Sequence, residues 1–222
     1  MAANTDWIRD VIGDHTKSHP FVRSEMISTL IEVGPTLGRE TLETYVARTA
    51  KQRKLLNVLK GYASNIEDSV KNGVNIVLSG NTGTGKDHLC IGIAKKAFVK
   101  SIVVKWLNGV QLKALCDEAI NDRDPIGKAA NYLTKPAVLW LSDPVLPGEI
   151  LSPVHKDFLY LVVDCRYRAS KPTWMTLNLD DAAQANTSIG SPTIDRIRNG
   201  AIMCDCDWPS YRKPLEWSSN AK

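Results

Sequence analysis

The chain has 222 residues, of which 43% are hydrophobic and 23% are charged, and its formal net charge is +4. This composition excludes wholesale disorder, and five scattered cysteines exclude a disulfide framework. No apolar run approaches the ~18 to 20 residues that cross a bilayer. The first residues lack the basic and apolar stretches of a signal peptide. We therefore expect a cytoplasmic protein with no membrane partner.

Residues 1–40 are expected to form a small helical segment separate from the rest of the chain. A first helix is indicated by apolar residues that share one face, namely Trp7, Ile8, Val11 and Ile12. A second is indicated between Pro20 and Pro35 by Phe21, Met26, Ile27, Leu30 and Ile31. Two such short helices lack a large core of their own, so we expect them to dock on the main domain or on a partner protein.

From residue 41 to residue 222 the pattern is that of one α/β domain. Helical periodicity is clearest from Leu42 to Leu59, and further helices are expected over 111–120 and 158–168, with a polar break near 121–125. Five apolar runs predict strands, at 74–79, 101–106, 137–142, 173–177 and 201–206. Strands that alternate with helices predict a parallel, doubly wound sheet flanked by helices.

The run at 74–79 leads directly into a glycine-rich turn and then a helix, which is the context of a phosphate-binding loop. The turn fits G-x-x-x-x-G-K, whose glycines let backbone N–H groups point at phosphate oxygens. The helix N-terminus adds partial positive charge, and Lys86 would reach the β- and γ-phosphates. We therefore expect ATP to bind at Gly80, Asn81, Thr82, Gly83, Thr84, Gly85, Lys86, Asp87 and His88.

Two acids are candidates for holding Mg²⁺ beside the nucleotide. The position after the lysine, usually Ser or Thr, is Asp87 here, and a carboxylate is also a hard oxygen ligand. Asp143 follows the apolar run 137–142 and precedes a Pro/Gly-rich loop, as the acid at a neighbouring strand end should. Its rival Asp164 runs on into a helical segment. We expect Asp87 and Asp143 to be the Mg²⁺ ligands.

The residue that follows Asp143 puts hydrolysis in doubt. ATPases of this type usually carry a Glu there that orients the attacking water, and this chain carries Pro144. The sequence does not show whether Glu149 or Asp157 takes over that task. We expect weak or absent hydrolysis, which leaves open an enzyme or an adaptor that only binds ATP.

Polar residues further along are candidates for γ-phosphate contacts. Asn178 ends the run 173–177, where it could sense the γ-phosphate, although an Asn at a strand end is also an ordinary turn residue. Arg196 and Arg198 could reach the γ-phosphate of a neighbouring subunit. The alternative is a surface arginine or one paired with Asp195.

Basic residues gather in two runs. The first has no acids and contains Arg48, Lys51, Arg53, Lys54 and Lys60, and the second contains Lys95, Lys96, Lys100 and Lys105. Each run fits an electrostatic footprint for nucleic acid or a solvated helix face, and the sequence does not separate the two.

Taken together, the motifs of residues 40–213 resemble those of the DnaC-like helicase loaders, a group of AAA+ ATPases. The segment 80–89, G-N-T-G-T-G-K-D-H-L, is similar to their P-loop, and Lys171-Pro172-Thr173 with Asn178 resembles their sensor-1 strand. Asp195-Arg196-Ile197 resembles the arginine-finger stretch, and 208–212 resembles the closing W-x-S-Y-R. The resemblance implies an AAA+ P-loop fold with Asp143, Asn178 and Arg196 as the catalytic residues.

The resemblance also implies a role in DNA replication. Such a protein binds ATP, associates with itself through nucleotide-bridged subunit contacts, and loads a replicative ring helicase on single-stranded DNA. Residues 1–40 would bind the helicase and residues 41–222 would form the ATPase core. A chain this short suits a phage or prophage replication module.

An IstB-like transposition helper ATPase is the main alternative, because it shares the core and nearly all of these motifs. Binding to a replicative helicase or to a transposase would separate the two. A small-molecule kinase also has a P-loop, but it does not account for Asn178, Arg196 and the segment 208–212.

Overall fold

The computed structural model describes residues 6–13, 19–121, 125–179 and 182–213. Its strands are β1 (Ile76–Ser79), β2 (Val104–Asn108), β3 (Val138–Ser142), β4 (Thr173–Leu177) and β5 (Ile202–Asp205). Its helices are α1 (Asp6–Ile12), α2 (Pro20–Gly38), α3 (Ala50–Ser64), α4 (Ile66–Lys71), α5 (Lys86–Val99), α6 (Gly109–Asn121), α7 (Pro125–Thr134), α8 (Pro153–Arg168), α9 (Ala182–Ile189) and α10 (Ser191–Arg198).

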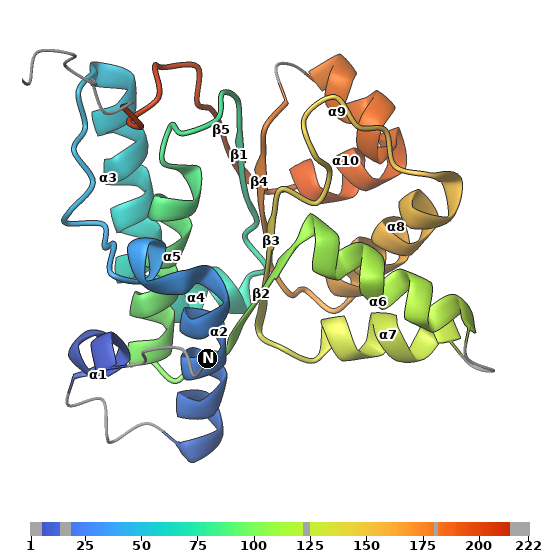
Figure 1. Cartoon of the computed structure of the whole chain (residues 1–222), viewed down its shortest axis with the longest axis horizontal. Coiled ribbons are helices and arrows are strands. Elements are labelled where there is room, and N and C mark those ends of the chain that lie inside the picture. The colour runs from blue at the N-terminus through green and yellow to red at the C-terminus, as the bar shows by residue number, and fades with distance from the viewer. Residues whose placement is uncertain (1–5, 14–18, 122–124, 180–181, 214–222) are drawn as a thin grey trace, which may run out of the picture.

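The strands form one parallel sheet in the order β2-β3-β4-β1-β5. Helices α1 to α5 cover one face and α6 to α10 cover the other (Figure 1). This arrangement confirms the parallel, doubly wound sheet that the alternating pattern predicts. No helix in the described part of the chain combines the length and the hydropathy needed to cross a membrane.

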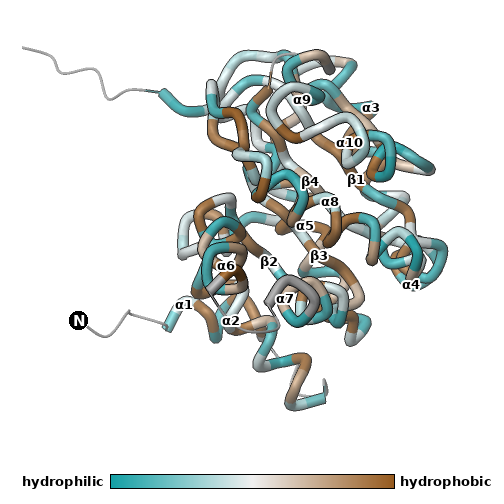
Figure 2. The backbone as a smooth tube through the Cα atoms, turned by 90° about the vertical axis from the view of Figure 1, so that its right-hand side faces the viewer, coloured by the Kyte–Doolittle hydropathy of each residue, from teal (hydrophilic) through white to brown (hydrophobic). Residues whose placement is uncertain are grey.

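The core lies on both faces of the sheet, because successive side chains of a strand point in opposite directions. Trp140 and Trp174 are fully buried toward the α5 face, whereas Leu139, Leu141 and Met175 are fully buried toward the α8 face. Figure 2 shows hydrophobic stretches along the strands and α5 in the middle of the molecule. Strands buried on both faces explain why these segments are continuous apolar runs.

The two N-terminal helices pack on the main domain. The Thr29 hydroxyl of α2 donates to the Val104 carbonyl of β2 over 3.2 Å, and α1 places Trp7 against Gly38. Helix α2 bends at Gly34, which has a positive φ of 79°, just before Pro35. The apolar faces of both helices therefore belong to the core on the α5 side of the sheet.

The helix predicted from Leu42 to Leu59 is wrong over its first eight residues. Helix α3 begins at Ala50, where Thr49 and Gln52 form a reciprocal capping box. Before it, backbone N–H groups bond to the Thr41 and Thr44 hydroxyls in turns. Side-chain oxygens satisfy the backbone locally there, so apolar spacing alone misplaces the helix start.

Candidate nucleotide-binding site

The glycine-rich loop lies between β1 and α5, and the packing around it requires two of its glycines. A Cβ on Gly80 would lie 2.7 Å from the Cys206 carbonyl oxygen, because β5 runs directly beside it. A Cβ on Gly85 would lie 2.8 Å from the Tyr45 ring. Both glycines also have positive φ, 116° and 88°, a conformation that glycine adopts without steric cost.

Lys86 is a buried cation whose direct hydrogen-bond partners are all neutral. Its ammonium donates hydrogen bonds to the Gly80 carbonyl (2.9 Å), the Asn81 carbonyl (2.6 Å) and Asn178 Oδ1 (2.7 Å). Among the described residues, no carboxylate forms a salt bridge with it. Burial lowers the pKa of Lys86. A buried ammonium held only by neutral oxygens is a strong site for an incoming anion.

Asp87 is held by two hydroxyls that the sheet places side by side. Ser142 of β3 and Thr176 of β4 are register partners. The Ser142 hydroxyl donates to Asp87 Oδ2 over 3.0 Å, and the Thr176 hydroxyl donates to Asp87 Oδ1 over 2.7 Å. The carboxylate is therefore fixed at the carboxyl ends of the two strands.

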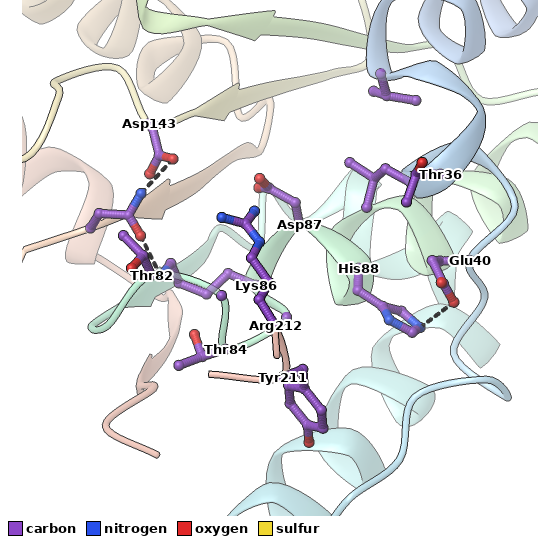
Figure 3. Close-up of a pocket in the computed structure, with 15 residues that line it drawn as sticks. Thr36, Glu40, Thr82, Thr84, Lys86, Asp87, His88, Asp143, Tyr211 and Arg212 are labelled. Atoms are coloured by element: carbon purple, nitrogen blue, oxygen red, sulfur yellow. Dashed lines mark hydrogen bonds and ion pairs between the residues drawn. The ribbon is translucent and has the colours of Figure 1, made fainter. Parts of the chain in front are cut away.

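Asp143 and Asn178 lie at the ends of the same two strands and bond to each other. Asn178 Nδ2 donates to Asp143 Oδ2 over 2.6 Å, so Lys86, Asn178 and Asp143 form one chain of hydrogen bonds (Figure 3). Burial, and then the charge of Asp87, raise the pKa of Asp143 to about 6. Asp143 Oδ1 is buried and finds no hydrogen-bond partner among the described residues. A free carboxylate oxygen near a second carboxylate fits a hard divalent cation such as Mg²⁺.

The loop opens into a pocket of about 540 Å³, a size typical of small-molecule sites. Most of the predicted site residues line it, namely Thr82, Gly83, Thr84, Gly85, Lys86, Asp87, His88, Asp143 and Asn178. Gly80 and Asn81 do not line the pocket, but their carbonyls accept hydrogen bonds from the Lys86 ammonium. Another wall consists of Val33, Thr36 and Leu37 of α2. The sequence alone does not indicate this wall, because only the three-dimensional packing brings α2 to the loop.

The His88 side chain is turned away from the phosphate loop. Its Nε2 lies 2.8 Å from the Thr41 carbonyl and 3.4 Å from Glu40 Oε2 (Figure 3). The imidazole therefore joins α5 to the turns that precede α3.

The C-terminal residues fold over the loop. The Tyr211 backbone N–H donates to the Gly83 carbonyl over 2.8 Å, and the Trp208 indole N–H donates to the Thr84 carbonyl over 2.9 Å. Gln52 of α3 donates to the Tyr211 hydroxyl over 2.9 Å. Arg212 lines the pocket (Figure 3). Tyr211 and Arg212 were not among the predicted site residues, although both belong to the segment 208–212 that resembles the closing W-x-S-Y-R.

Arg196 does not line this pocket. Its Nε donates to Asp164 Oδ1 over 3.0 Å, and it lies over the Tyr167 ring. Asp164, the rival magnesium ligand, is buried between Arg196 and Arg168 on α8. Arg196 lies instead in a separate polar depression, with Tyr167, Asp195, Arg198 and Asn199.

Neither acid considered as a substitute for the missing Glu lines the pocket. Glu149 Oε1 accepts a hydrogen bond from the Lys113 ammonium at 2.6 Å, and its other oxygen accepts one from the Leu146 N–H. Asp157 lies on α8.

Comparisons with known proteins place the chain in a family. The model of the family described as IstB-like ATP binding protein matches residues 36–214. The chain is 28% identical over 182 residues to the replicative helicase loader DnaC of Buchnera aphidicola subsp. Schizaphis graminum, and the match covers 78% of this chain and 69% of that protein. It is 25% identical over 175 residues to DnaC of Escherichia coli (strain K12), with the same two coverages.

Solved structures show the fold. A crystal structure of the DnaC helicase loader superposes with a TM-score of 0.66 at 21% identity, covering 78% of this chain and 99% of the other. AMPPCP-bound DnaA from Aquifex aeolicus has a TM-score of 0.60 at 19% identity, covering 75% of this chain and 50% of the other. The fold is therefore that of an AAA+ P-loop protein, as expected. The chain belongs to the IstB-like ATP-binding protein family, which confirms the DnaC-like AAA+ resemblance of its motifs.

Proposed function

We propose that this chain is an ATP-binding loader that carries a replicative ring helicase to single-stranded DNA. ATP binding is supported by Lys86, a buried ammonium that neutral oxygens surround and that lines the pocket. Binding to a helicase is supported by the relatives, which are named replicative helicase loaders. Replication of DNA in the cytoplasm is the setting in which such a protein acts.

ATP and Mg²⁺ have assigned positions in this proposal. Lys86 and the N–H groups of the loop bind the phosphates, and Asp143 and Asp87 hold Mg²⁺, which neutralises phosphate charge when bound. The apolar side chains of Val33 and Leu37 offer a surface for the base. Asn178 senses the γ-phosphate, because its amide bonds both Lys86 and Asp143.

Hydrolysis is weak or absent in this account. Pro144 carries no group that orients water, and Glu149 is held by Lys113 outside the pocket. We expect turnover below the ~1 to 100 s⁻¹ of ordinary phosphoryl-transfer enzymes, measured as phosphate release from ATP. A Glu149→Gln variant should release phosphate at the wild-type rate; a further loss would assign the water-orienting role to Glu149.

Self-association brings Arg196 to the nucleotide of a neighbouring subunit. Its guanidinium is held by Asp164 and lies outside the pocket of its own chain. That placement suits action in trans, where an arginine stabilises charge on a γ-phosphate.

Residues 1–40 contact the helicase and residues 41–222 form the ATPase core. A groove between α1 and α2 supports the first assignment, because its apolar lining is flanked by two arginines. The groove is lined by Ile8, Arg9, Ile12, Gly13, Arg23, Ile27 and Ile31. Helix α2 also reaches the nucleotide pocket, so the helicase-binding segment and the ATP site share one helix.

A pull-down with the replicative helicase of the same cell, with and without ATP, tests this function. Deleting residues 1–40 would remove buried core residues such as Leu30, so the groove variant Arg23→Glu/Ile31→Asp replaces the deletion. Val99→Asp/Lys135→Glu makes the same two kinds of change elsewhere on the surface. We expect the groove variant to lose the helicase and the control to retain it. No capture by the wild type in any nucleotide state would contradict the proposal.

The second candidate is a transposition helper ATPase, favoured by the match to the IstB-like family model. It differs in its protein partner, so a transposase is the second bait in the same pull-down. Capture of the transposase instead of the helicase would replace the loader proposal.

A further inference from the structure

The two basic runs of the chain have different surroundings. In the second run, Lys96 pairs with Glu43 at 3.1 Å, Lys100 with Glu67 at 3.2 Å, and Lys105 with Glu32 at 3.8 Å. Lys95 donates to the Glu40 carbonyl over 2.7 Å. These lysines therefore link α5 and β2 to neighbouring segments of the same chain, and their ammonium groups already have partners within the chain.

Four residues of the first run lie on α3, whose solvent side has no acid, and Arg48 precedes the helix. No Asp or Glu occurs from Arg48 to Ile66. Lys51 pairs with Asp207 at 2.8 Å, and Arg48 lies over the Tyr211 ring. The remaining three basic side chains, Arg53, Lys54 and Lys60, are exposed and form no ion pair with any described residue.

The fold presents this face outward. Leu55, Leu56 and Leu59 bury the inner side of α3, and α5 separates the helix from the sheet (Figure 1). Asn57 and Ser64, both exposed, add uncharged hydrogen-bonding groups to the outer side. From Arg53 to Lys60 the helix rises about 10 Å, which is enough to meet several phosphates of a DNA strand.

We propose that the outer face of α3, formed by Arg53, Lys54, Asn57, Lys60 and Ser64, binds the phosphate backbone of single-stranded DNA. Lysine, arginine, asparagine and serine are donors that contact phosphate oxygens without reading bases. An acidic surface of the helicase would meet the same charges, and the pull-down below distinguishes it from DNA. It rests on the proposed function for its ligand and assigns a surface separate from the ATP pocket.

The test is fluorescence anisotropy of a labelled oligothymidylate titrated with the full chain at several salt concentrations. The variant Arg53→Glu/Lys60→Glu should bind at least about 10-fold more weakly. The slope of log affinity against log salt should shrink by about 1.4, since each phosphate contact to a single strand contributes about 0.7. Arg39→Glu/Lys135→Glu changes the net charge equally on other parts of the surface and should bind like the wild type.

Three results would overturn the inference. The wild type could fail to bind the oligonucleotide, the two variants could weaken binding equally, or the α3 variant could lose the helicase in a pull-down while keeping DNA. Thermal unfolding and ATP binding of the α3 variant confirm that it is folded. A failure on DNA with helicase binding intact overturns this surface and leaves the loader proposal standing.

Discussion

Lys86 and Arg196 are both held in place by hydrogen bonds from within the chain, but the groups that hold them differ. Neutral oxygens hold Lys86, whereas the Asp164 carboxylate holds Arg196. Lys86 is buried, and the Arg196 side chain is 36% exposed. One cation lies inside a pocket with no carboxylate in direct contact, and the other is paired with a carboxylate at the surface.

The difference indicates two roles: Lys86 binds a ligand that enters from solvent, whereas Arg196 offers its guanidinium to another molecule. A buried ammonium with no carboxylate in direct contact gains most from an anion that enters from solvent. An arginine oriented by a carboxylate keeps free N–H groups that can be offered to another molecule. Three predictions test this distinction, and a fourth tests the segment that closes over the loop; they run from the largest expected effect to the smallest.

Removing the buried Lys86 ammonium should have the largest effect. Lys86→Ala should weaken ATP binding by about 100-fold or more, because charge-assisted hydrogen bonds to phosphate are lost. Isothermal titration of the purified chain with ATP and Mg²⁺ measures this. Lys95→Ala, which removes another partly buried lysine of α5, is the matched control and should bind ATP as the wild type does. Equal affinity in the wild type and Lys86→Ala would break the comparison.

The negative charge beside Lys86 should make stability depend on pH. The pKa of Asp143 is raised to about 6 by burial and by Asp87, so its charged form is disfavoured in the folded state. Without nucleotide and Mg²⁺, the free energy of unfolding of the wild type relative to Asp143→Asn should rise as the pH falls from 8 to 5. The gain should be on the order of 1 to 2 kcal/mol. Urea denaturation at several pH values measures it, and a difference independent of pH would contradict the assignment.

Arg196 should affect self-association between subunits but not ATP binding. Arg196→Ala should bind ATP normally but lose about 10-fold in ATP-dependent self-association, measured by analytical ultracentrifugation. Mixing it with Lys86→Ala should restore an ATP-dependent hetero-complex, because one variant supplies the nucleotide and the other supplies the arginine. Arg198→Ala should associate normally. If the mixture stays as dissociated as each variant alone, Arg196 does not act in trans.

The smallest effect concerns the segment that closes over the loop. Tyr211→Phe removes a hydrogen bond donated to the Val46 carbonyl (2.6 Å) and one accepted from Gln52 (2.9 Å). It should lower the free energy of unfolding by about 1 kcal/mol, measured by denaturation. Tyr132→Phe, at an exposed position, should have no effect. An unchanged free energy of unfolding in Tyr211→Phe would mean that these hydrogen bonds do not hold the segment in place.

Local pattern was enough to predict the phosphate loop and the existence of the five strands, although the second strand, expected at 101–106, lies at Val104–Asn108. The run 173–177 matches β4 residue for residue, and Lys86 begins a helix directly after the glycine turn. Asp143 and Asn178 could also be found, because each is the first polar residue after an apolar strand. Parallel strands bring such ends together at one edge.

What the sequence could not predict depended on register and packing. The hydroxyls that hold Asp87 come from strands whose pairing has to be known first. The apolar wall from α2 requires the N-terminal helices to be docked. Helix α7 was missed because a polar segment precedes it. Asp164 was a fair rival to Asp143 until the structure showed its oxygens bonded to two arginines.

Loading onto closed circular single-stranded DNA tests the central claim most directly. Such DNA has no end over which a closed helicase ring could thread. The helicase of the same cell, the circular DNA and this chain would be combined with and without ATP, and helicase retained on the DNA would be measured after gel filtration. The account predicts helicase on the circle only when the chain and ATP are both present, and none with Lys86→Ala. Equal helicase on the circle without the chain, or with Lys86→Ala, would contradict it.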